Sequence, residues 1–318
     1  MKMKHEVMVR KTFLDGKRVH EHLRRIIRSW QLYVLLALPF LSLIIFEYIP
    51  MYGILIAFKE YKVSRGIWGS PWVGFKYFEM FFTSPSFSQL LRNTLTLSLY
   101  DFLASFSFPI VLALMLNEIK SMAFKKFVQT VTYIPYFLST VVVIGLVMQV
   151  FSYGGIMNSI LHAIGLAKVD YLSKPMMFQH LYVWSGIWQR TGYAAIIYIA
   201  ALASVDTSLY EAALLDGASR LKKIIYIDIP SILPVIVILF ILNAGHILSV
   251  GFEKAYLLQN PVNTSVSEVI STYVYKIGLQ NAQYSFGTAV GLFNAVVSLV
   301  MIIGVNWIAR RVNETSLW

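Results

Sequence analysis

The sequence predicts an all-α protein that crosses a membrane six times. Of its 318 residues, 57% are hydrophobic and only 14% are charged, whereas a soluble domain carries roughly 25% charged residues. The charged residues lie mainly between long apolar stretches, as expected for membrane-spanning helices. Cysteine is absent, which excludes a disulfide framework, a thiolate metal site and a cysteine nucleophile.

Six stretches of the chain reach the length of about 20 apolar residues that a spanning helix needs. The first runs from Gln31 to Ala57. It is too long for the apolar region of a cleaved signal peptide, which has about 7–15 residues. The spans are predicted at residues 31–57, 90–117, 127–151, 177–204, 231–251 and 286–309.

Polar residues and prolines mark the ends of several predicted spans. The second span has Asn93 and Thr94 near its start, and the sixth ends at the two arginines 310–311. The fifth follows Pro230 and contains Pro234. Because proline suits the first turn of a helix but not its interior, Pro230 is expected to begin a new helix there.

The distribution of Lys and Arg predicts that both termini face the cytoplasm. The segments 1–30, 118–126, 205–230 and 310–318 hold 17 of the 27 Lys and Arg residues, with nine in the N-terminal arm 1–30. The segments on the opposite side hold nine. Cytoplasmic loops carry this excess of basic residues, so the net charge of +11 is assigned to topology and not to nucleic-acid binding.

Two long segments are predicted on the outer side. Residues 59–89 contain seven Trp, Phe and Tyr side chains between positions 68 and 82. Such rings favour the headgroup level, so this segment is expected along the outer membrane surface, with direct contact to a receptor domain as the alternative. Residues 252–285 form the other segment, in which 265–279 is expected to be a short surface helix.

The cytoplasmic segment 205–230 is predicted to form a helix–turn–helix projection. It has about 26 residues, although a plain connection between two spans needs only about 5–10. Ala and Leu favour a helix before Gly217, and glycine permits a turn with positive φ. A second helix is expected at 221–229, ending where Pro230 starts the next span. Small residues at the tip would let a soluble partner approach the backbone closely.

The same segment resembles the EAA motif of ABC importer permeases. Glu-Ala-Ala is followed after two residues by Asp-Gly-Ala, and then by Ile227 and Pro230. Ile224 departs from the motif, which commonly has an aromatic residue there. The resemblance implies that ATPase coupling is performed by Glu211, Ala212, Ala213, Asp216, Gly217, Ala218, Ser219, Arg220, Ile224, Ile227 and Pro230.

Further stretches resemble the maltose-type carbohydrate-uptake permeases, in particular the branch that works with oligosaccharide-binding lipoproteins. These stretches are residues 93–95, 116–118, 133–137, 251–253, 272–275 and 316–318. The resemblance implies a type I ABC importer permease fold in a bacterial cytoplasmic membrane, with a coupling helix between helices four and five. It also implies alternating access and a heterodimer with a second homologous permease.

The implied partners extend beyond the second permease. Two ATP-binding cassette subunits would bind below, and they would hold the ATP and Mg that this chain is expected to lack. An extracytoplasmic sugar-binding protein would dock above. The sequence itself contains no GK[ST] phosphate loop, no His/Glu cluster with zinc spacing and no assignable pair of glycosidase acids. Neither ATP hydrolysis nor other catalysis is therefore expected in this chain.

Asp101 and Arg190 are two charged residues inside predicted spans. They lie about 11 and 13 residues into spans two and four, which run in the same direction. A charge inside the bilayer is usually paired or faces a cavity. An ion pair between the two is predicted, and the alternative places Arg190 in the translocation cavity, where it could meet an acidic sugar.

Several polar or aromatic residues in spans four to six are candidates for the substrate path. Sugar sites combine aromatic faces with hydrogen-bonding groups, although hydrogen bonds between spans would explain the same residues equally well. The candidates are Trp188, Gln189, Arg190, Asn243, His246 and Asn294.

Other functions stay open at this point. The chain could be an ABC permease for a non-sugar solute such as a phosphodiester or a peptide. A secondary transporter would be expected to show inverted repeats and broken spans. A membrane scaffold or sensor without transport is the third alternative.

Overall fold

The computed structural model describes residues 28–244 and 250–313, which are helical or irregular, with a single isolated bridge between Lys59 and Trp72. The chain divides into two units, residues 1–55 and 56–318. Among the described residues, five helices are long and apolar enough to span a membrane, and a sixth is reached when the bent pair α10 and α11 is counted.

The described part of the first unit is one helical run. It comprises α2 (Trp30–Leu43), the π-turn η1 (Ile44–Tyr48) and α3 (Ile49–Met51), and it continues into the 3₁₀ segment η2 (Tyr52–Phe58). This agrees with the predicted span 31–57. Within α2, η1 and α3 no residue is buried, so the apolar surface of this helix requires lipid or another protein as its surroundings.

The second unit begins with the segment predicted on the outer side, which connects to α6. Its helical elements are η3 (Val63–Arg65), α4 (Gly66–Gly69) and α5 (Lys76–Phe82). Trp68, Trp72 and Phe75 are exposed, as expected for rings at a membrane surface, but Phe81 is buried. Phe81 packs against Phe286 and other rings of α6 and α17, which ties this segment to the helix bundle.

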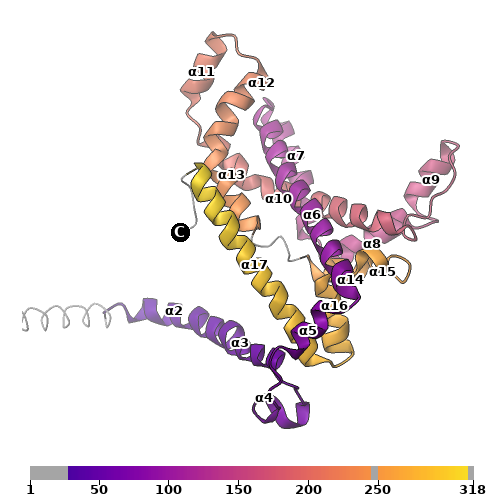
Figure 1. The fold of residues 1–318 in the computed structure, drawn as a ribbon. Coiled ribbons are helices and arrows are strands. Elements are labelled where there is room, and N and C mark those ends of the chain that lie inside the picture. The colour runs from indigo at the N-terminus through magenta and orange to yellow at the C-terminus, as the bar shows by residue number, and fades with distance from the viewer. Residues whose placement is uncertain (1–27, 245–249, 314–318) are drawn as a thin grey trace, which may run out of the picture. The chain divides into compact units, whose positions relative to one another are not determined.

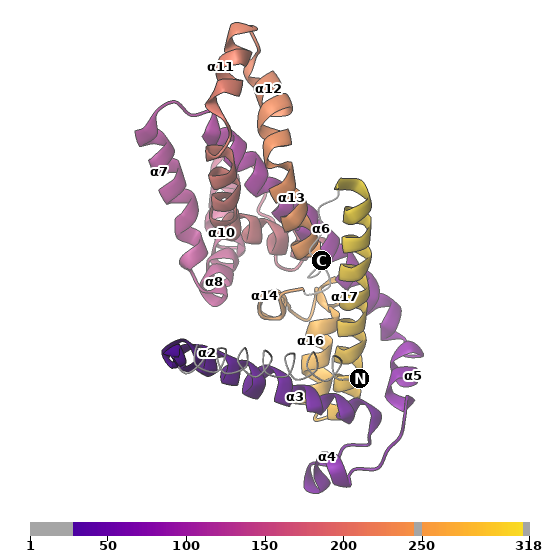
Figure 2. The same ribbon diagram turned by 90° about the vertical axis from the view of Figure 1, so that its left-hand side faces the viewer.

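The centre of the second unit is the pair formed by α6 (Ser86–Asn117) and α10 (Pro175–Ala203) (Figures 1 and 2). Both match the predicted spans 90–117 and 177–204. One buried cluster joins them to α8 and α14 through residues such as Leu97 and Val183. A second cluster joins their far ends to α13 through Ala113, Ala195 and Ile232. The two alanines let the helices approach closely, as is common between membrane helices.

The predicted span 127–151 is not one continuous helix. The structure has α7 (Met122–Tyr133), the 3₁₀ turn η4 (Ile134–Phe137), α8 (Thr140–Phe151) and α9 (Ile156–Ala163) in this region. Pro135 cannot donate a helical hydrogen bond, and Ser139 caps the new helix by accepting from the backbone N–H of Val142 at 3.4 Å. The stretch that meets the length and hydropathy of a span is residues 140–163.

The fifth span also differs from its prediction. The elements α12 (Arg220–Lys223), η5 (Ile224–Asp228) and α13 (Ile229–Ala244) form one uninterrupted run. The π-turn η5 accommodates Pro230, and the Ser231 hydroxyl donates to the carbonyl of Ile227 at 2.6 Å. Pro230 therefore does not separate two helices. The predicted end at residue 251 is wrong, because Val250 and Gly251 lie outside any helix.

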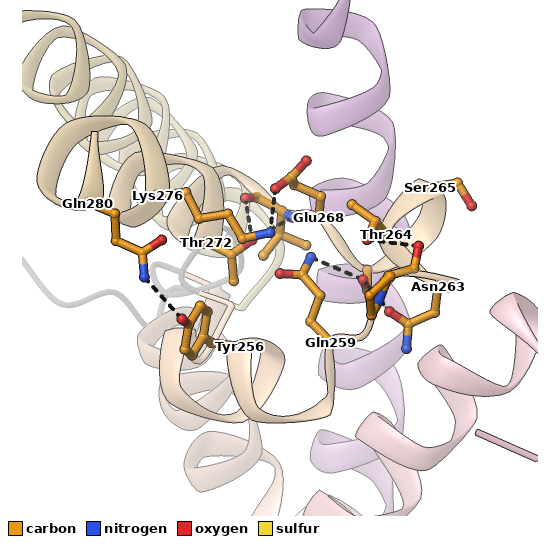
Figure 3. A network of polar contacts seen from close by, with 12 residues as sticks. Tyr256, Gln259, Asn263, Thr264, Ser265, Glu268, Thr272, Lys276 and Gln280 are labelled. Carbon is orange, nitrogen blue, oxygen red and sulfur yellow. Dashed lines mark hydrogen bonds and ion pairs between the residues drawn. The ribbon is translucent and has the colours of Figure 1, made fainter. Parts of the chain in front are cut away.

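The segment after residue 250, also predicted on the outer side, folds into short helices held by a polar network (Figure 3). These are α14 (Phe252–Leu258), α15 (Thr264–Ser267), α16 (Ile270–Val274) and the π-turn η6 (Tyr275–Gln280). The predicted helix 265–279 is thus interrupted at residues 268–269. Lys276 donates to Glu268 at 2.9 Å, and Gln259 donates to Ser267 at 3.1 Å.

This network is anchored on the start of α6. Asn93 donates to the carbonyls of Ser265 and Glu268, both at 3.0 Å, and Thr94 accepts from the N–H of Ile270 at 3.0 Å. The polar pair near the start of the second span therefore satisfies backbone groups of the outer segment. The chain then continues into α17 (Tyr284–Asn313), which matches the span 286–309.

Candidate coupling hairpin and translocation site

The segment between α10 and α13 forms a hairpin of α11 (Thr207–Leu215) and α12. α11 leaves α10 at an angle of 73°. Asp206 caps the start of α11 by accepting from the N–H of Ser208 at 2.9 Å, and this bond lowers the pKa of the Asp206 carboxyl. Ser219 caps α12 through the N–H of Lys222 at 3.4 Å. The hairpin extends beyond the bundle at the N-terminal end of α13 (Figures 1 and 2).

The turn of the hairpin depends on Gly217, which has φ +68°. Its N–H donates to the carbonyl of Leu214 at 3.2 Å, and the next N–H, that of Ala218, donates to Ala213 at 2.9 Å. These two bonds form a Schellman motif, in which glycine is favoured because it has no Cβ. No atom lies within 4 Å of where a Cβ on Gly217 would be, so the backbone at the tip is open to a partner.

Apolar side chains surround this tip. Leu214 and Leu221 are each 71% exposed, and Leu215 is 89% exposed. The neighbouring Asp216 and Arg220 are also exposed. An exposed group of leucines with charged residues beside it is typical of a surface that another protein covers.

The remaining residues of the EAA-like motif divide between the tip and the base of the hairpin. Glu211, Ala212, Ser219 and Pro230 are exposed, whereas Ala213 and Ala218 are half-buried. At the base, Ile224 and Ile227 are half-buried, and Ile224 packs against the cluster that includes Leu202 and Ile232. The aliphatic side chain of Ile224 therefore fills a contact inside the protein.

The base of the hairpin is attached to α6 by a buried polar group. Asp228 in η5 is fully buried, and one of its carboxylate oxygens accepts from the hydroxyl of Tyr210 and from the amide of Asn117, the latter at 3.4 Å. Burial raises the pKa of the Tyr210 hydroxyl to about 12, and the hydrogen bond to Asp228 adds to this rise. Tyr210 therefore keeps its proton and remains a donor.

Glu118 adds an ionic contact beside this group. Lys223 lies 3.3 Å from the Glu118 carboxylate, and the side chains of both residues are mostly buried. Arg220 reaches the same carboxylate at 3.9 Å but is largely exposed. We call Asn117, Glu118, Tyr210, Lys223 and Asp228 the root cluster. The sequence marks Asn117 and Glu118 only as part of the stretch 116–118 that resembles the permease family. Nothing in the sequence marks Tyr210, Lys223 or Asp228 as functional residues.

The two charged residues within the spans form an ion pair in the structure. Arg190 Nη2 lies 3.1 Å from Asp101 Oδ1 and 3.2 Å from Asp101 Oδ2. The pair also lines a cavity of 150 Å³ between α6, α10 and α13, whose polar lining comprises Ser98, Asp101, Ser105, Tyr182, Arg190 and Asn243. The side chain of Arg190 is 48% exposed. The predicted ion pair is therefore present, and Arg190 also borders this cavity, whereas its contact with a sugar stays a prediction.

A second cation, Lys254 of α14, lies next to this pair. Its Nζ is 4.6 Å from the ring centroid of Tyr182, and the residue is only 8% exposed. Burial lowers the pKa of the Lys254 amine to about 7, Arg190 lowers it further, and Asp101 opposes the shift. The sequence offered no signal for Lys254, because it belongs to an outer segment and meets α10 only through the fold.

The other predicted path residues are dispersed. Trp188 lines a separate, mostly apolar cavity of 420 Å³ together with Trp184 and His180. Gln189 donates to the carbonyl of Leu138 at 2.9 Å. This bond satisfies a backbone acceptor between η4 and α8, where the helix is interrupted. Asn294 lies on α17 with a buried, unpaired Oδ1.

Among the candidates, Arg190 and Asn243 share the first cavity, whereas His246 lies outside the described residues. Within the part of the chain that the structure describes, no three His, Asp or Glu side chains are grouped as metal ligands would be.

Comparison with known proteins agrees with this architecture. Residues 105–314 match the family of binding-protein-dependent transport system inner membrane components. The chain is 42% identical to protein LplB of Bacillus subtilis and 42% identical to the polygalacturonan/rhamnogalacturonan transport system permease protein YteP of the same organism, over 92% of each chain.

Two solved structures are also similar. One is a bacterial ABC transporter involved in the import of the acidic polysaccharide alginate, with a TM-score of 0.84, 43% identity and coverage of 91% of this chain and 98% of that chain. The other is the bacterial alginate ABC transporter in complex with an alginate pentasaccharide-bound periplasmic protein, with a TM-score of 0.85 and 42% identity over 92% of this chain and 99% of that one. The chain has the type I permease fold and belongs to the family of binding-protein-dependent transport system inner membrane components.

Proposed function

We propose that this chain is the translocation subunit of an ATP-driven importer for oligosaccharides. The similarity to a permease for polygalacturonan and rhamnogalacturonan, and to a transporter that imports alginate, supports a saccharide substrate. The similarity covers nine-tenths of each chain, so it includes the outer segments and the cavity as well as the hairpin.

The observation that carries this proposal is the hairpin tip. Leu214, Leu215 and Leu221 are exposed around a turn whose backbone is accessible at Gly217. On the proposed function these leucines enter a groove of an ATP-binding cassette subunit. ATP and Mg would bind to two such subunits and not to this chain.

The root cluster connects the hairpin to α6. Asp228 receives hydrogen bonds from Tyr210 of α11 and from Asn117 of α6, so a displacement of the hairpin is transferred to the end of a spanning helix. ATP binding can drive alternating access only if ATP has a higher affinity for one of the two conformations. Closure of the ATPase pair around ATP would supply that difference.

The remaining partners and the orientation follow from the same assignment. On this proposal the hairpin between spans four and five is cytoplasmic, so both termini would also lie in the cytoplasm, and the Lys and Arg distribution supports this orientation. A second homologous permease would complete the translocation path as a heterodimer. An extracytoplasmic sugar-binding protein would deliver the oligosaccharide from the outer side of a bacterial cytoplasmic membrane.

The test is co-purification and coupling of the assembled importer with Gly217→Asp. An aspartate adds a charge among the three leucines and strains a backbone with positive φ. We expect loss of the co-purified ATPase, or ATP hydrolysis without uptake. Gly165→Asp is the matched control, because Gly165 also has a positive φ and open space around it but lies outside the hairpin. Normal uptake by the Gly217 variant would contradict the docking role.

A further inference from the structure

Two buried donors beside the cavity have no hydrogen-bond partner. Ser98 is 6% exposed and its Oγ is unpaired, although the residue lines the cavity. Lys254 is similarly buried and its Nζ is unpaired. Buried polar groups are nearly always hydrogen-bonded, so two unpaired donors in one region point to a missing acceptor.

The two cations are brought together by a glycine. Tyr182, Gly186 and Arg190 lie four residues apart on one face of α10, and α14 places Lys254 against that face. A Cβ on Gly186 would lie 2.8 Å from Nζ of Lys254 and 2.9 Å from Nη2 of Arg190. Because Gly186 has no side chain, both nitrogens can occupy the space beside it.

The local charges do not balance. Asp101 is bound to Arg190 and is also the carboxylate that acts on Lys254, so one negative charge faces two basic groups, and Nζ of Lys254 has no hydrogen-bond acceptor. An unpaired buried ammonium is strongly unfavourable. The available groups are a hydroxyl, an ammonium and the free N–H groups of a half-exposed guanidinium. A carboxylate matches this set, because it supplies both the negative charge and the acceptor oxygens.

We propose that the cavity between α6, α10 and α13 binds the carboxylate of an acidic sugar unit, with Arg190 as the accessible donor and Ser98 as the neutral donor. Lys254 lies beside Arg190, next to the residues that line the cavity, and supplies the second cation. The importer is accordingly selective for oligosaccharides that contain uronate units. This inference rests on the proposed function and names its substrate class. The cavity of 150 Å³ suits a carboxylate and part of one ring, not a whole oligosaccharide.

A purely structural role for Lys254 makes a different prediction. If the lysine only packs above the Tyr182 ring, an uncharged side chain of similar length keeps the packing and loses only the cation–π contact, so it should affect the uptake of acidic and uncharged substrates alike. Lys254→Met removes the unpaired ammonium, so the stability of the complex is expected to stay equal or to rise. Carboxylate binding predicts instead that the same variant loses uptake of acidic substrates while its stability is kept.

The experiment uses the complete importer with its binding protein in proteoliposomes. The probes are di- to pentasaccharides from alginate and polygalacturonate, their uncharged methyl esters, and neutral arabino- and galacto-oligosaccharides. For the acidic probe that wild type takes up best, we expect Lys254→Met to lower uptake about tenfold, the effect of losing a charged hydrogen bond. The ratio of acidic to ester uptake should fall with it, and Lys254→Arg should restore most of the loss.

Lys276→Met is the matched control, since Lys276 lies in the same outer segment but is paired with Glu268. It should leave the ratio of acidic to ester uptake unchanged. Three outcomes would overturn the carboxylate site: wild type takes up neutral probes only, Lys254→Met lowers both probes equally, or it changes neither. An equal loss would indicate that Lys254 supports transport in general and does not recognise a carboxylate. Absence of uptake and of ATPase stimulation with every saccharide would instead refute the proposed function.

Discussion

The root cluster and the charged group in the cavity both combine acidic and basic side chains, but they differ in how far their polar atoms have partners. In the root cluster, Asp228 is held by Tyr210 and Asn117, and Glu118 is paired with Lys223. In the cavity, one aspartate faces two cations and two donors are unpaired. In the root cluster each side-chain donor has an acceptor, and the unpaired atom is an acceptor, Oδ2 of Asp228. In the cavity the unpaired atoms are donors, which indicates that a ligand with acceptor atoms completes that group.

The largest effect is expected for a substitution in the root cluster. Asp228→Ala leaves the hydroxyl of Tyr210 and the amide of Asn117, both half-buried, without an acceptor. Each unsatisfied group costs about 1–3 kcal/mol, so we expect the thermal stability of the complex to fall and ATP hydrolysis to proceed with little uptake. The measurements are the melting temperature and the number of ATP molecules hydrolysed per sugar.

A double-mutant cycle tests whether the lost hydrogen bonds of the root cluster cause these effects. Tyr210→Phe removes only the hydroxyl, and added to Asp228→Ala it should have little further effect, because the two side chains share one hydrogen bond. Additive losses would contradict a single connected group and would weaken the contrast with the cavity.

A smaller loss of stability is expected when the charges at the cavity are changed, and a second substitution should partly reverse it. Asp101→Asn removes the only carboxylate next to Arg190 and Lys254 among the described residues. We expect a loss of about 1 kcal/mol in stability, because Arg190 is half-exposed and its pairing is partly screened. Adding Lys254→Met should recover part of this loss, since it removes the uncompensated cation. A double variant that is less stable than Asp101→Asn alone would show that Lys254 stabilises the protein in another way.

The hairpin was predictable because its signals are local. Alanine and leucine favour α11, glycine is needed at the turn, and the positions lie between two apolar spans. The ion pair of Asp101 and Arg190 was also predictable, since position within a span gives depth. In each case the inference needed only sequence spacing and the direction of a helix.

The rest depends on contacts that spacing does not reveal. The break at Pro135 lies in a continuous apolar stretch, and the π-turn before Pro230 keeps a helix intact where proline usually interrupts it. Lys254 reaches Arg190 only because α14 packs on α10 at Gly186. Asp228 is likewise joined to Asn117 across 111 positions of sequence.

The smallest expected effect separates buried from exposed pairing within the root cluster. Glu118→Gln removes the charge that faces Lys223, and we expect a loss of about 0.5–1 kcal/mol in the stability of the complex. Arg220→Gln is the matched variant, because Arg220 reaches the same carboxylate at 3.9 Å with a largely exposed side chain. It should leave the melting temperature unchanged, whatever it does to ATPase docking. Arg220→Gln could instead destabilise the complex as much as Glu118→Gln does. The stability of the root cluster would then depend on surface charges and not on buried hydrogen bonds, and the root cluster would no longer differ from the cavity in this respect.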